Sequence, residues 1–329
     1  MKEISLGIIG LGAEGRLMLT SSQRLKNARV EAVADLSEKA RNSARKKGIK
    51  KVYEKYEDML KDDKIDAVII CLPNFLHEEA AVKSAEYRKD ILLEKPLARS
   101  VEEGERILSA AHKNAVKLMV GFDMRFESAP LRIHDQIRDG YFGDVQLAEA
   151  TNISGGPFSP RSDHVGPVQV PQWWLSRDLV GGGALLDLGS HLIDLFVWYF
   201  GAAQSAQCYL KHLFRTELED TATCVLKFKN GTVGIAKVGW FSKGFVESVQ
   251  ICGTAKNTLI QLSPKTTARI ALSGIAKKFG HPQSDPRFWE IQHFVDCIQK
   301  DEQPSPSGEE GLLGLQAISM AYQNAEIVE

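Results

Sequence analysis

Residues 4–15 read ISLGIIGLGAEG, a short apolar run followed at once by the pattern Gly-x-Gly-x-x-Gly. The run Ile4–Ile9 predicts a strand, and a helix is expected directly after the glycines. Twenty residues past Gly15, the strand-like segment 30–34 is followed by Asp35. Strand, glycine turn, helix and acid in this order are the fingerprint of a dinucleotide-binding fold, in which glycines permit the turn and the approach of the pyrophosphate.

The glycine turn and the acid after it are therefore the first expected cofactor-binding residues: Gly10, Leu11, Gly12, Ala13, Gly15 and Asp35. Asp35 can accept hydrogen bonds from both ribose hydroxyls of NAD and would repel a 2′-phosphate. Leu36 and Ser37 follow it and bring no arginine for such a phosphate. NAD is expected as the cofactor rather than NADP.

Strand-like and helical segments alternate over the first 120 residues. Strands are predicted at 5–9, 31–34, 67–71, 90–93 and 117–120, and helices at 38–47, 56–61, 78–85 and 101–114. Such alternation is typical of a parallel sheet with helices on both faces. The fold class is therefore α/β, with an N-terminal Rossmann dinucleotide-binding domain over residues 1–122.

The pattern changes after Gly121. A helix at 129–139 precedes strand-like segments at 145–153, 206–212, 221–229, 232–239, 246–252 and 257–262. Asn230-Gly231 predicts a hairpin turn. Residues 123–308 are expected to form a C-terminal α+β domain with a large, mostly antiparallel or mixed sheet, and a last helix at about 309–326 to pack back on the first domain.

Composition excludes several classes of protein. Of the 329 residues 25% are charged and 43% hydrophobic, and the net charge is −1. Neither a nucleic-acid nor a membrane partner is expected, and no apolar run approaches the roughly 18 residues of a bilayer span. Five cysteines without a CxxC pair predict reduced thiols in a cytoplasmic protein and no metal site.

Near the middle of the chain, Gly181–Gly183 precedes Asp187, His191 and Asp194 in an otherwise apolar run. On one helix, offsets of 0, 4 and 7 residues share a face. Two carboxylates beside an imidazole are costly to desolvate without a purpose, and they can hold the ring in one tautomer and keep it basic. The alternative is a helix whose solvated edge carries three polar residues.

Three further landmarks stand between these motifs: Pro73-Asn74 with His77, then Glu94-Lys95-Pro96, then residues 121–126 with Arg125. In this order and spacing, from residue 5 to about 200, the chain resembles the Gfo/Idh/MocA family of glucose–fructose oxidoreductase and inositol dehydrogenase. The motifs are specific for the family but not for one member.

The resemblance implies an NAD(P)-dependent oxidoreductase that interconverts a hydroxyl and a ketone on a sugar, inositol or related polyol. His191 would act as general base, held by Asp187, while Lys95 would bind the same oxygen and stabilise alkoxide charge. Glu94 would lie by the nicotinamide ribose, and further cofactor contacts would come from Leu72, Pro73, Asn74 and His77. Substrate-binding residues would be Lys95, Arg125, Trp174, Asp187, His191 and Asp194.

Each residue has a structural alternative. Lys95 can be a surface lysine in a turn, and His77 a supporting residue at a helix start. Arg125 can pair with an acid across the domain junction, and Trp174 can belong to the core or an interface. Glu14 departs from the family, which usually has an uncharged residue there, because a carboxylate would repel the pyrophosphate unless it points outward.

Two other functions remain open. One is an NAD-dependent glycosidase or isomerising enzyme that uses transient oxidation on the same scaffold. The other is a non-catalytic nucleotide-sensing regulator, which the presence of both Lys95 and His191 disfavours. The resemblance also implies a homodimer or homotetramer paired through second-domain sheets. If residues 1–122 fold alone, they are expected to bind nucleotide without catalysing a reaction.

Overall fold

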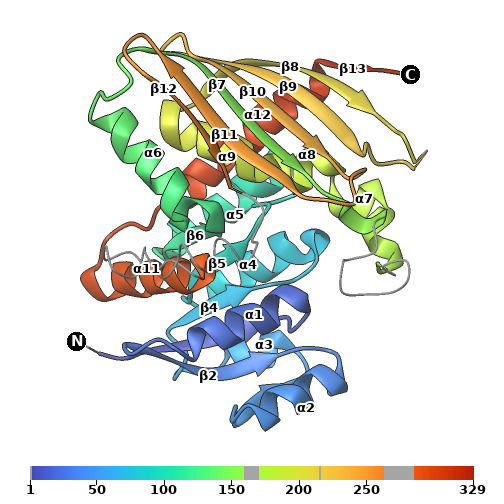
Figure 1. Ribbon diagram of the computed structural model, residues 1–329. Helices are drawn as coiled ribbons and strands as arrows, with labels where there is room; N and C mark the ends of the chain where they lie inside the picture. Colours follow the sequence, from blue (N-terminus) through green and yellow to red (C-terminus); the bar gives the residue numbers. More distant parts are fainter. Residues whose placement is uncertain (1, 159–169, 215, 263–284) are drawn as a thin grey trace. The chain divides into compact units, whose positions relative to one another are not determined.

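The computed structural model describes residues 2–158, 170–214, 216–262 and 285–329, which fall into two compact units (Figure 1). Unit 1 comprises Met1–Phe126 and Asp285–Leu312, and unit 2 comprises Glu127–Ser284 and Leu313–Glu329. The expected second domain of residues 123–308 is therefore wrong at its carboxyl end, because the segment from Asp285 returns to the nucleotide-binding unit.

Unit 1 contains a six-stranded parallel sheet in the order β3-β2-β1-β4-β5-β6. Its strands are β1 (Ile4–Ile9), β2 (Ala28–Ala34), β3 (Lys51–Tyr53), β4 (Ala67–Ile70), β5 (Asp90–Glu94) and β6 (Leu118–Gly121). The predicted Rossmann-type sheet is confirmed. The three-residue strand β3 was not predicted, because so short a segment carries no periodicity.

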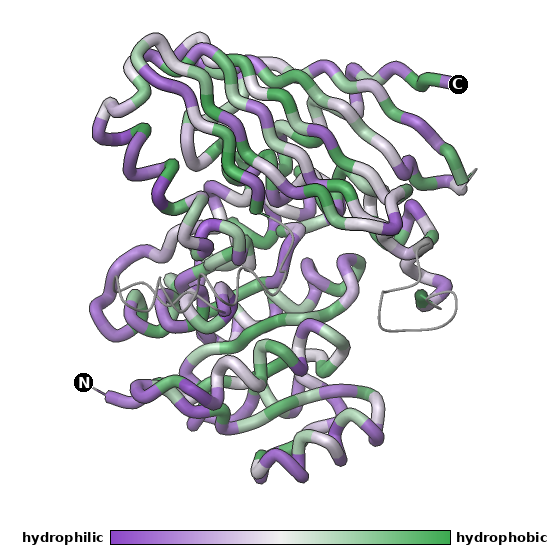
Figure 2. Tube along the Cα trace, in the orientation of Figure 1, coloured by the Kyte–Doolittle hydropathy of each residue, from purple (hydrophilic) through white to green (hydrophobic). Residues whose placement is uncertain are grey.

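The two central strands, β1 and β4, are buried along their whole length, and the middle of this sheet is mostly hydrophobic in Figure 2. This is typical of parallel strands, because crossover helices cover both faces of the sheet. The strand order reverses between β1 and β4. At such a switch point, the loops at the carboxyl ends of the strands bind ligands in open α/β sheets.

The helices of unit 1 are α1 (Ala13–Ser22), α2 (Glu38–Lys46), α3 (Tyr56–Leu60), α4 (His77–Glu86), α5 (Val101–Asn114) and α11 (Pro286–Lys300), with short 3₁₀ turns η1 (Asn74–Leu76) and η2 (Asp123–Phe126). Helix α11 was not predicted. It packs on α1 (Figure 1), and its Ile291, Phe294 and Val295 are fully buried in the core that contains Met18 and Leu19.

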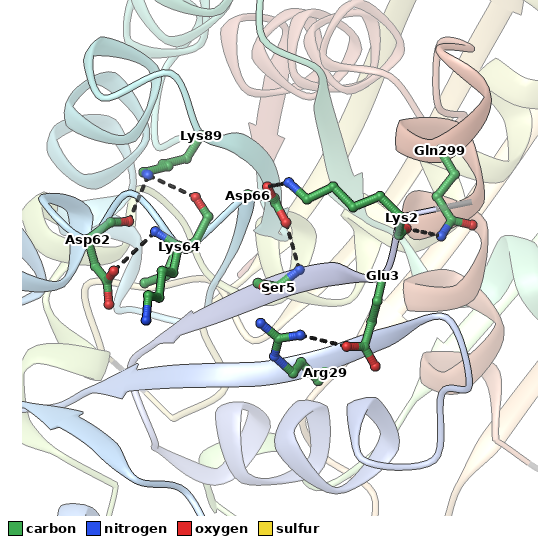
Figure 3. Close-up of polar contacts among 10 residues, drawn as sticks. Lys2, Glu3, Ser5, Arg29, Asp62, Lys64, Asp66, Lys89 and Gln299 are labelled. Atoms are coloured by element: carbon green, nitrogen blue, oxygen red, sulfur yellow. Dashed lines mark hydrogen bonds and ion pairs between the residues drawn. The ribbon is translucent and has the colours of Figure 1, made fainter.

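Polar contacts connect the amino ends of β1 and β4, at the opposite end of these strands from the ligand-binding loops (Figure 3). Asp66 accepts hydrogen bonds from Lys2 Nζ at 2.5 Å and from the Ser5 amide at 2.9 Å. The buried Lys89 donates to the carbonyl oxygens of Asp62 and Ile65, and burial lowers the pKa of its ammonium. These side chains pair with each other and with nearby backbone groups, and no role in the site was predicted for them.

Unit 2 contains a seven-stranded sheet in the order β12-β11-β7-β10-β9-β8-β13. Its strands are β7 (Val145–Ile153), β8 (Ala203–Lys211), β9 (Thr221–Phe228), β10 (Val233–Gly239), β11 (Val246–Gly253), β12 (Asn257–Gln261) and β13 (Ala325–Ile327). Strands β7 and β10 pair in parallel, as do β8 and β13, and the other neighbours are antiparallel. The mixed alternative is confirmed, as is the hairpin at Asn230-Gly231 between β9 and β10.

The helices of unit 2 lie on the sheet or in its connections. They are α6 (Ser128–Arg138), α7 (Arg177–Val180), α8 (Ala184–Asp187) and α9 (Gly189–Phe200), with 3₁₀ turns η3 (Gly156–Phe158) and η4 (Gln172–Leu175), while α12 (Gly308–Gln323) begins in unit 1 and ends in unit 2. Helix α9 packs on β7 and β10. Within the described ranges no single helix could cross a bilayer, although the bent pair Arg177–Asp187 and Gly189–Phe200 has the required length and composition.

The cysteines differ from expectation. Cys208 on β8 lies opposite Cys224 on β9 in the antiparallel register, and the two form a disulfide. The expectation of five reduced thiols is wrong for this pair, because cross-strand neighbours cannot be identified from the spacing of cysteines along the chain. Cys71, Cys252 and Cys297 are free thiols.

Candidate functional site

The glycine turn between β1 and α1 has the geometry that a dinucleotide requires. Gly10 has φ +88°, and a Cβ on Gly15 would lie 1.9 Å from the Gly10 carbonyl oxygen. Both positions therefore exclude larger residues. A Cβ on Gly12 would meet no atom within 4 Å, so the backbone is open on that side. The amino terminus of α1 thus offers amide groups and open space to a pyrophosphate.

Asp35 follows β2 and faces this turn. Its carboxylate accepts hydrogen bonds from the Leu11 amide at 2.6 Å and from the Ser37 amide at 2.7 Å. Each oxygen retains a further lone pair for a ribose hydroxyl. The guanidinium of Arg41, which the sequence reasoning missed, donates to the carbonyl oxygens of Asp35 and Leu36. The residues present fit an NAD-type cofactor.

Two loops at the carboxyl ends of β4 and β5 are joined by His77. Its ring nitrogens each lie 2.9 Å from a carbonyl oxygen, one of Leu72 and one of Pro96. Burial lowers the pKa of His77, so the neutral ring can donate to only one of them at a time. His77 therefore connects the predicted cofactor loop of Pro73 and Asn74 to the turn that follows Lys95.

Glu94 and Lys95 stand at the end of β5, where the sequence predicted cofactor and substrate contacts. A Glu94 oxygen accepts from the Lys95 amide at 3.2 Å. Burial raises the pKa of Glu94 to about 8, and the charges of Glu14 and Asp123 contribute in the same direction. Glu94 can therefore carry a proton near neutral pH. Perturbed pKa values of this kind are common at functional sites.

Glu290 on α11 is, like Glu94, a buried acid with a raised pKa. Sequence reasoning missed it. It is 0% exposed, and neither carboxyl oxygen has a hydrogen-bond partner among the described residues. Burial raises the pKa of Glu290 well above its usual value, reinforced by the charges of Glu94 and Asp123. No sequence signal identifies it, because Glu290 stands in an ordinary amphipathic segment.

A pH dependence of stability follows from Glu290. Its pKa is higher in the folded protein than in the unfolded chain, so above the ordinary carboxyl pKa the folded state holds the extra proton. The free energy of unfolding should therefore fall as pH rises, by up to about 1.4 kcal/mol per pH unit for this group. Glu290→Gln, measured by urea unfolding from pH 5 to 8, should reduce that slope.

The matched control is Glu302→Gln, which changes an exposed carboxyl on the chain after the same helix. It should leave the slope as in the parent protein. An unchanged slope in Glu290→Gln would show that Glu290 is ionised in the folded state.

Arg125 in η2 has a structural partner. Its side chain is buried, and a guanidinium nitrogen lies 2.6 Å from Glu310 of α12 and 3.1 Å from the Ser305 hydroxyl. Of the two alternatives, pairing with an acid describes Arg125 here. Glu310 lies in the same unit as Arg125, so this ion pair is formed within one unit.

In unit 2 the segment with Asp187, His191 and Asp194 is not one straight helix. Asp187 ends α8, and His191 and Asp194 lie on α9 beyond a break at Leu188. The helical segments on either side are bent by 57°. His191 and Asp194 therefore share one helix, and the predicted single helix carrying Asp187 as well is wrong. Asp194 is 1% exposed, whereas Asp187 and His191 are half-buried.

Glu219, which sequence reasoning missed, supports this segment. Its fully buried carboxylate accepts hydrogen bonds from the amides of Gly183 at 2.9 Å and Leu185 at 3.1 Å, and from the Tyr322 hydroxyl at 2.7 Å. It thereby caps the start of α8. A Cβ on Gly183 would lie 2.0 Å from the Glu219 carbonyl oxygen, which explains a glycine there.

Trp174 in η4 is half-buried and stacks on Trp240, with ring centroids 5.5 Å apart. Trp240 is 2% exposed, so Trp174 rests on the core of unit 2. Arg161, Asp163 and His164, which precede it in the sequence, lie outside the described residues. Among the described residues, no group of three or more His, Cys, Asp or Glu side chains could hold a metal ion.

Two family models match the chain, one in each half. The model described as "Oxidoreductase family, NAD-binding Rossmann fold" matches residues 4–122. The model described as "GFO/IDH/MocA C-terminal domain" matches residues 131–257. Together they span more than half of the 329 residues.

Individual relatives are similar over nearly the full chain. The oxidoreductase YrbE of Bacillus subtilis is 26% identical over 326 residues, covering 94% of this chain and 91% of that protein. Myo-inositol 2-dehydrogenase of Thermotoga maritima is 24% identical, covering 94% and 92%. The structure of scyllo-inositol dehydrogenase from Lactobacillus casei with bound NAD(H) and scyllo-inositol superposes with a TM-score of 0.79 at 21% identity, covering 98% and 97%.

Proposed function

This chain belongs to the GFO/IDH/MocA family of NAD(P)-binding oxidoreductases, and from that premise we propose that it oxidises a secondary hydroxyl of a sugar, inositol or related polyol to a ketone, and can reverse the reaction. The observation that carries the proposal is that each matched region contains one of the two predicted reactive residues, Lys95 directly after β5 and His191 on α9. Named relatives act on related compounds: myo-inositol and D-xylose.

The proposed reaction removes two hydrogens from one CH–OH group and passes each to a different acceptor. The bound nicotinamide supplies a hydride acceptor for the hydrogen on carbon. His191 takes the hydroxyl proton, and Asp187 fixes the orientation of the imidazole. Lys95 binds the same oxygen and stabilises its negative charge as the C–H bond breaks. The products are a ketone, a reduced cofactor and a protonated base.

The remaining predicted residues have supporting roles in the proposal. Glu94, Pro73 and Asn74 contact the cofactor from the strand-end loops. Asp194, which is buried, supports α9 rather than a substrate hydroxyl. Trp174 offers its half-buried ring to an apolar sugar face.

The proposal is tested by incubating the whole chain with NAD and a panel of inositols, aldoses, ketoses and amino sugars while following the absorbance of NADH. At least one compound should give NADH together with its ketone. Conversion of a sugar without net NADH would favour the isomerising or glycosidase alternative. NAD binding without any conversion would favour the regulator.

Cofactor choice depends on Asp35. NAD should bind at least about tenfold more tightly than NADP, a difference of about 1.4 kcal/mol, because the carboxylate accepts ribose hydroxyls and repels a 2′-phosphate. Calorimetry with both cofactors measures this. Replacing Asp35 by Ser and Leu36 by Arg together should shift the preference toward NADP.

The single replacement Leu36→Arg is the matched control for this experiment. It adds the cation while keeping Asp35, so it should change the preference much less than the pair. Equal or tighter binding of NADP by the parent protein would contradict the assignment of Asp35.

A further inference from the structure

Glu14 is the one charged residue within the glycine turn of residues 10–15, and it stands in the first turn of α1. The pyrophosphate of a dinucleotide is expected at this helix terminus. A carboxylate at this terminus would repel the negatively charged pyrophosphate. The repulsion weakens binding unless a positive charge offsets it.

The structure supplies an offsetting charge from a distant part of the sequence. Arg287, in the first turn of α11, directs Nε and Nη2 at the two carboxylate oxygens of Glu14, the second at 3.1 Å. This is the two-pronged geometry in which arginine binds carboxylates most strongly. A third guanidinium nitrogen lies 3.9 Å from Asp123.

The position of Arg287 does not depend on Glu14 alone. Asp285, two residues before Arg287, accepts hydrogen bonds from the Ser21 hydroxyl at 2.8 Å and from Arg24 at 2.5 Å, at and just beyond the carboxyl end of α1. Apolar side chains of α11 complete the contact with α1 in the shared core. The guanidinium is therefore held beside the turn by contacts at both ends of α1.

We propose that Arg287 is a cofactor-affinity residue, which neutralises Glu14 and so permits a pyrophosphate to bind at the glycine turn. The ligand class is a dinucleotide carrying a pyrophosphate. The inference rests on the proposed NAD binding, and it extends that binding site to a helix that lies some 270 residues after the turn. The effect is electrostatic, because Arg287 acts through Glu14.

The test compares NAD dissociation constants of the whole chain by calorimetry for the parent protein, Arg287→Ala, Glu14→Gln and the double variant. Arg287→Ala should bind NAD about tenfold or more weakly, because Glu14 then faces the pyrophosphate uncompensated. Glu14→Gln should bind as tightly as the parent or more tightly. The double variant should return to within about threefold of the parent, because the repelling charge is gone.

Asp296→Ala is the matched control for the packing of α11. It removes the contacts of Asp296 with Asn27 and Gln292 and leaves those of Arg287 in place, so it should lower the melting temperature while leaving the NAD dissociation constant unchanged. If Arg287→Ala does not fold, Arg287→Met keeps an unbranched apolar side chain and removes the charged guanidinium, with the same expected loss. Raising the ionic strength should shrink the loss in either variant.

The inference is overturned if folded Arg287→Ala or Arg287→Met binds NAD as tightly as the parent. It is also overturned if the loss persists in the double variant, since Arg287 would then not act through Glu14. A parent protein that binds no NAD would instead reject the proposed function together with this inference.

Discussion

His191→Ala is expected to lower turnover of the substrate by about 10²–10⁴-fold, the usual contribution of one positioned acid–base group. The affinity for NAD should hardly change, because His191 belongs to unit 2 and the predicted cofactor residues belong to unit 1. Steady-state kinetics and NAD calorimetry on the same preparation measure both quantities. The melting temperature should stay close to that of the parent, since the side chain is only half-buried.

Lys95→Ala is the companion variant. It should reduce turnover to a similar degree, and the double variant should lose less than the product of the two losses, because both groups act on one oxygen. A structural histidine would instead lower the melting temperature and leave turnover nearly normal in the folded protein. A well-folded His191→Ala enzyme that keeps most of its activity would contradict the mechanism.

A chain ending at residue 122 is expected not to fold, so it would not meet the condition under which residues 1–122 were expected to bind nucleotide. Helix α11 contributes Ile291, Phe294 and Val295 to the core around α1. Their burial is worth about 1.5–3 kcal/mol each, so their loss approaches the whole stability of a typical domain. Circular dichroism and urea unfolding of the fragment measure this.

The control is residues 1–126 joined by a flexible linker to residues 285–312, which together make up unit 1. This chain should unfold cooperatively and bind NAD without dehydrogenase activity. If the 1–122 fragment unfolds cooperatively and binds NAD as tightly as the joined chain, the packing of α11 on α1 is not required.

The parallel sheet could be predicted because its information is local. Each strand is a short apolar run beside a helical segment, and the turn at Gly10 and Gly15 specifies its own conformation. The cofactor residues around that turn could be named for the same reason. The strands of unit 2 could be recognised from alternation and from Asn230-Gly231, since a hairpin joins neighbours in the sequence.

The features that were missed depend on long-range contacts. Helix α11 has an ordinary amphipathic pattern, and nothing in it indicates which unit it joins. Glu219 caps α8 from 36 residues away, and Arg287 pairs with Glu14 across 273 residues. The break at Leu188 was missed because the apolar run 184–200 reads as one continuous helix, although its two parts are bent.

The role of Arg125 shows the limit of a motif. Residues 121–126 predicted an arginine near the ligand, with pairing to an acid as the alternative. Its partner Glu310 begins a helix near the end of the chain. Only the fold identifies that acid, because no spacing along the sequence relates the two residues.

In the proposed reaction, the hydrogen on the hydroxyl-bearing carbon passes to the cofactor. The most direct measurement uses a substrate from the panel that carries deuterium on that carbon, with mass spectrometry of the reduced cofactor. We expect NADH that contains one deuterium, a ketone that has lost it, and neither product with Lys95→Ala and His191→Ala combined. Unlabelled NADH, or deuterium that remains in a rearranged sugar with no net NADH, would contradict it.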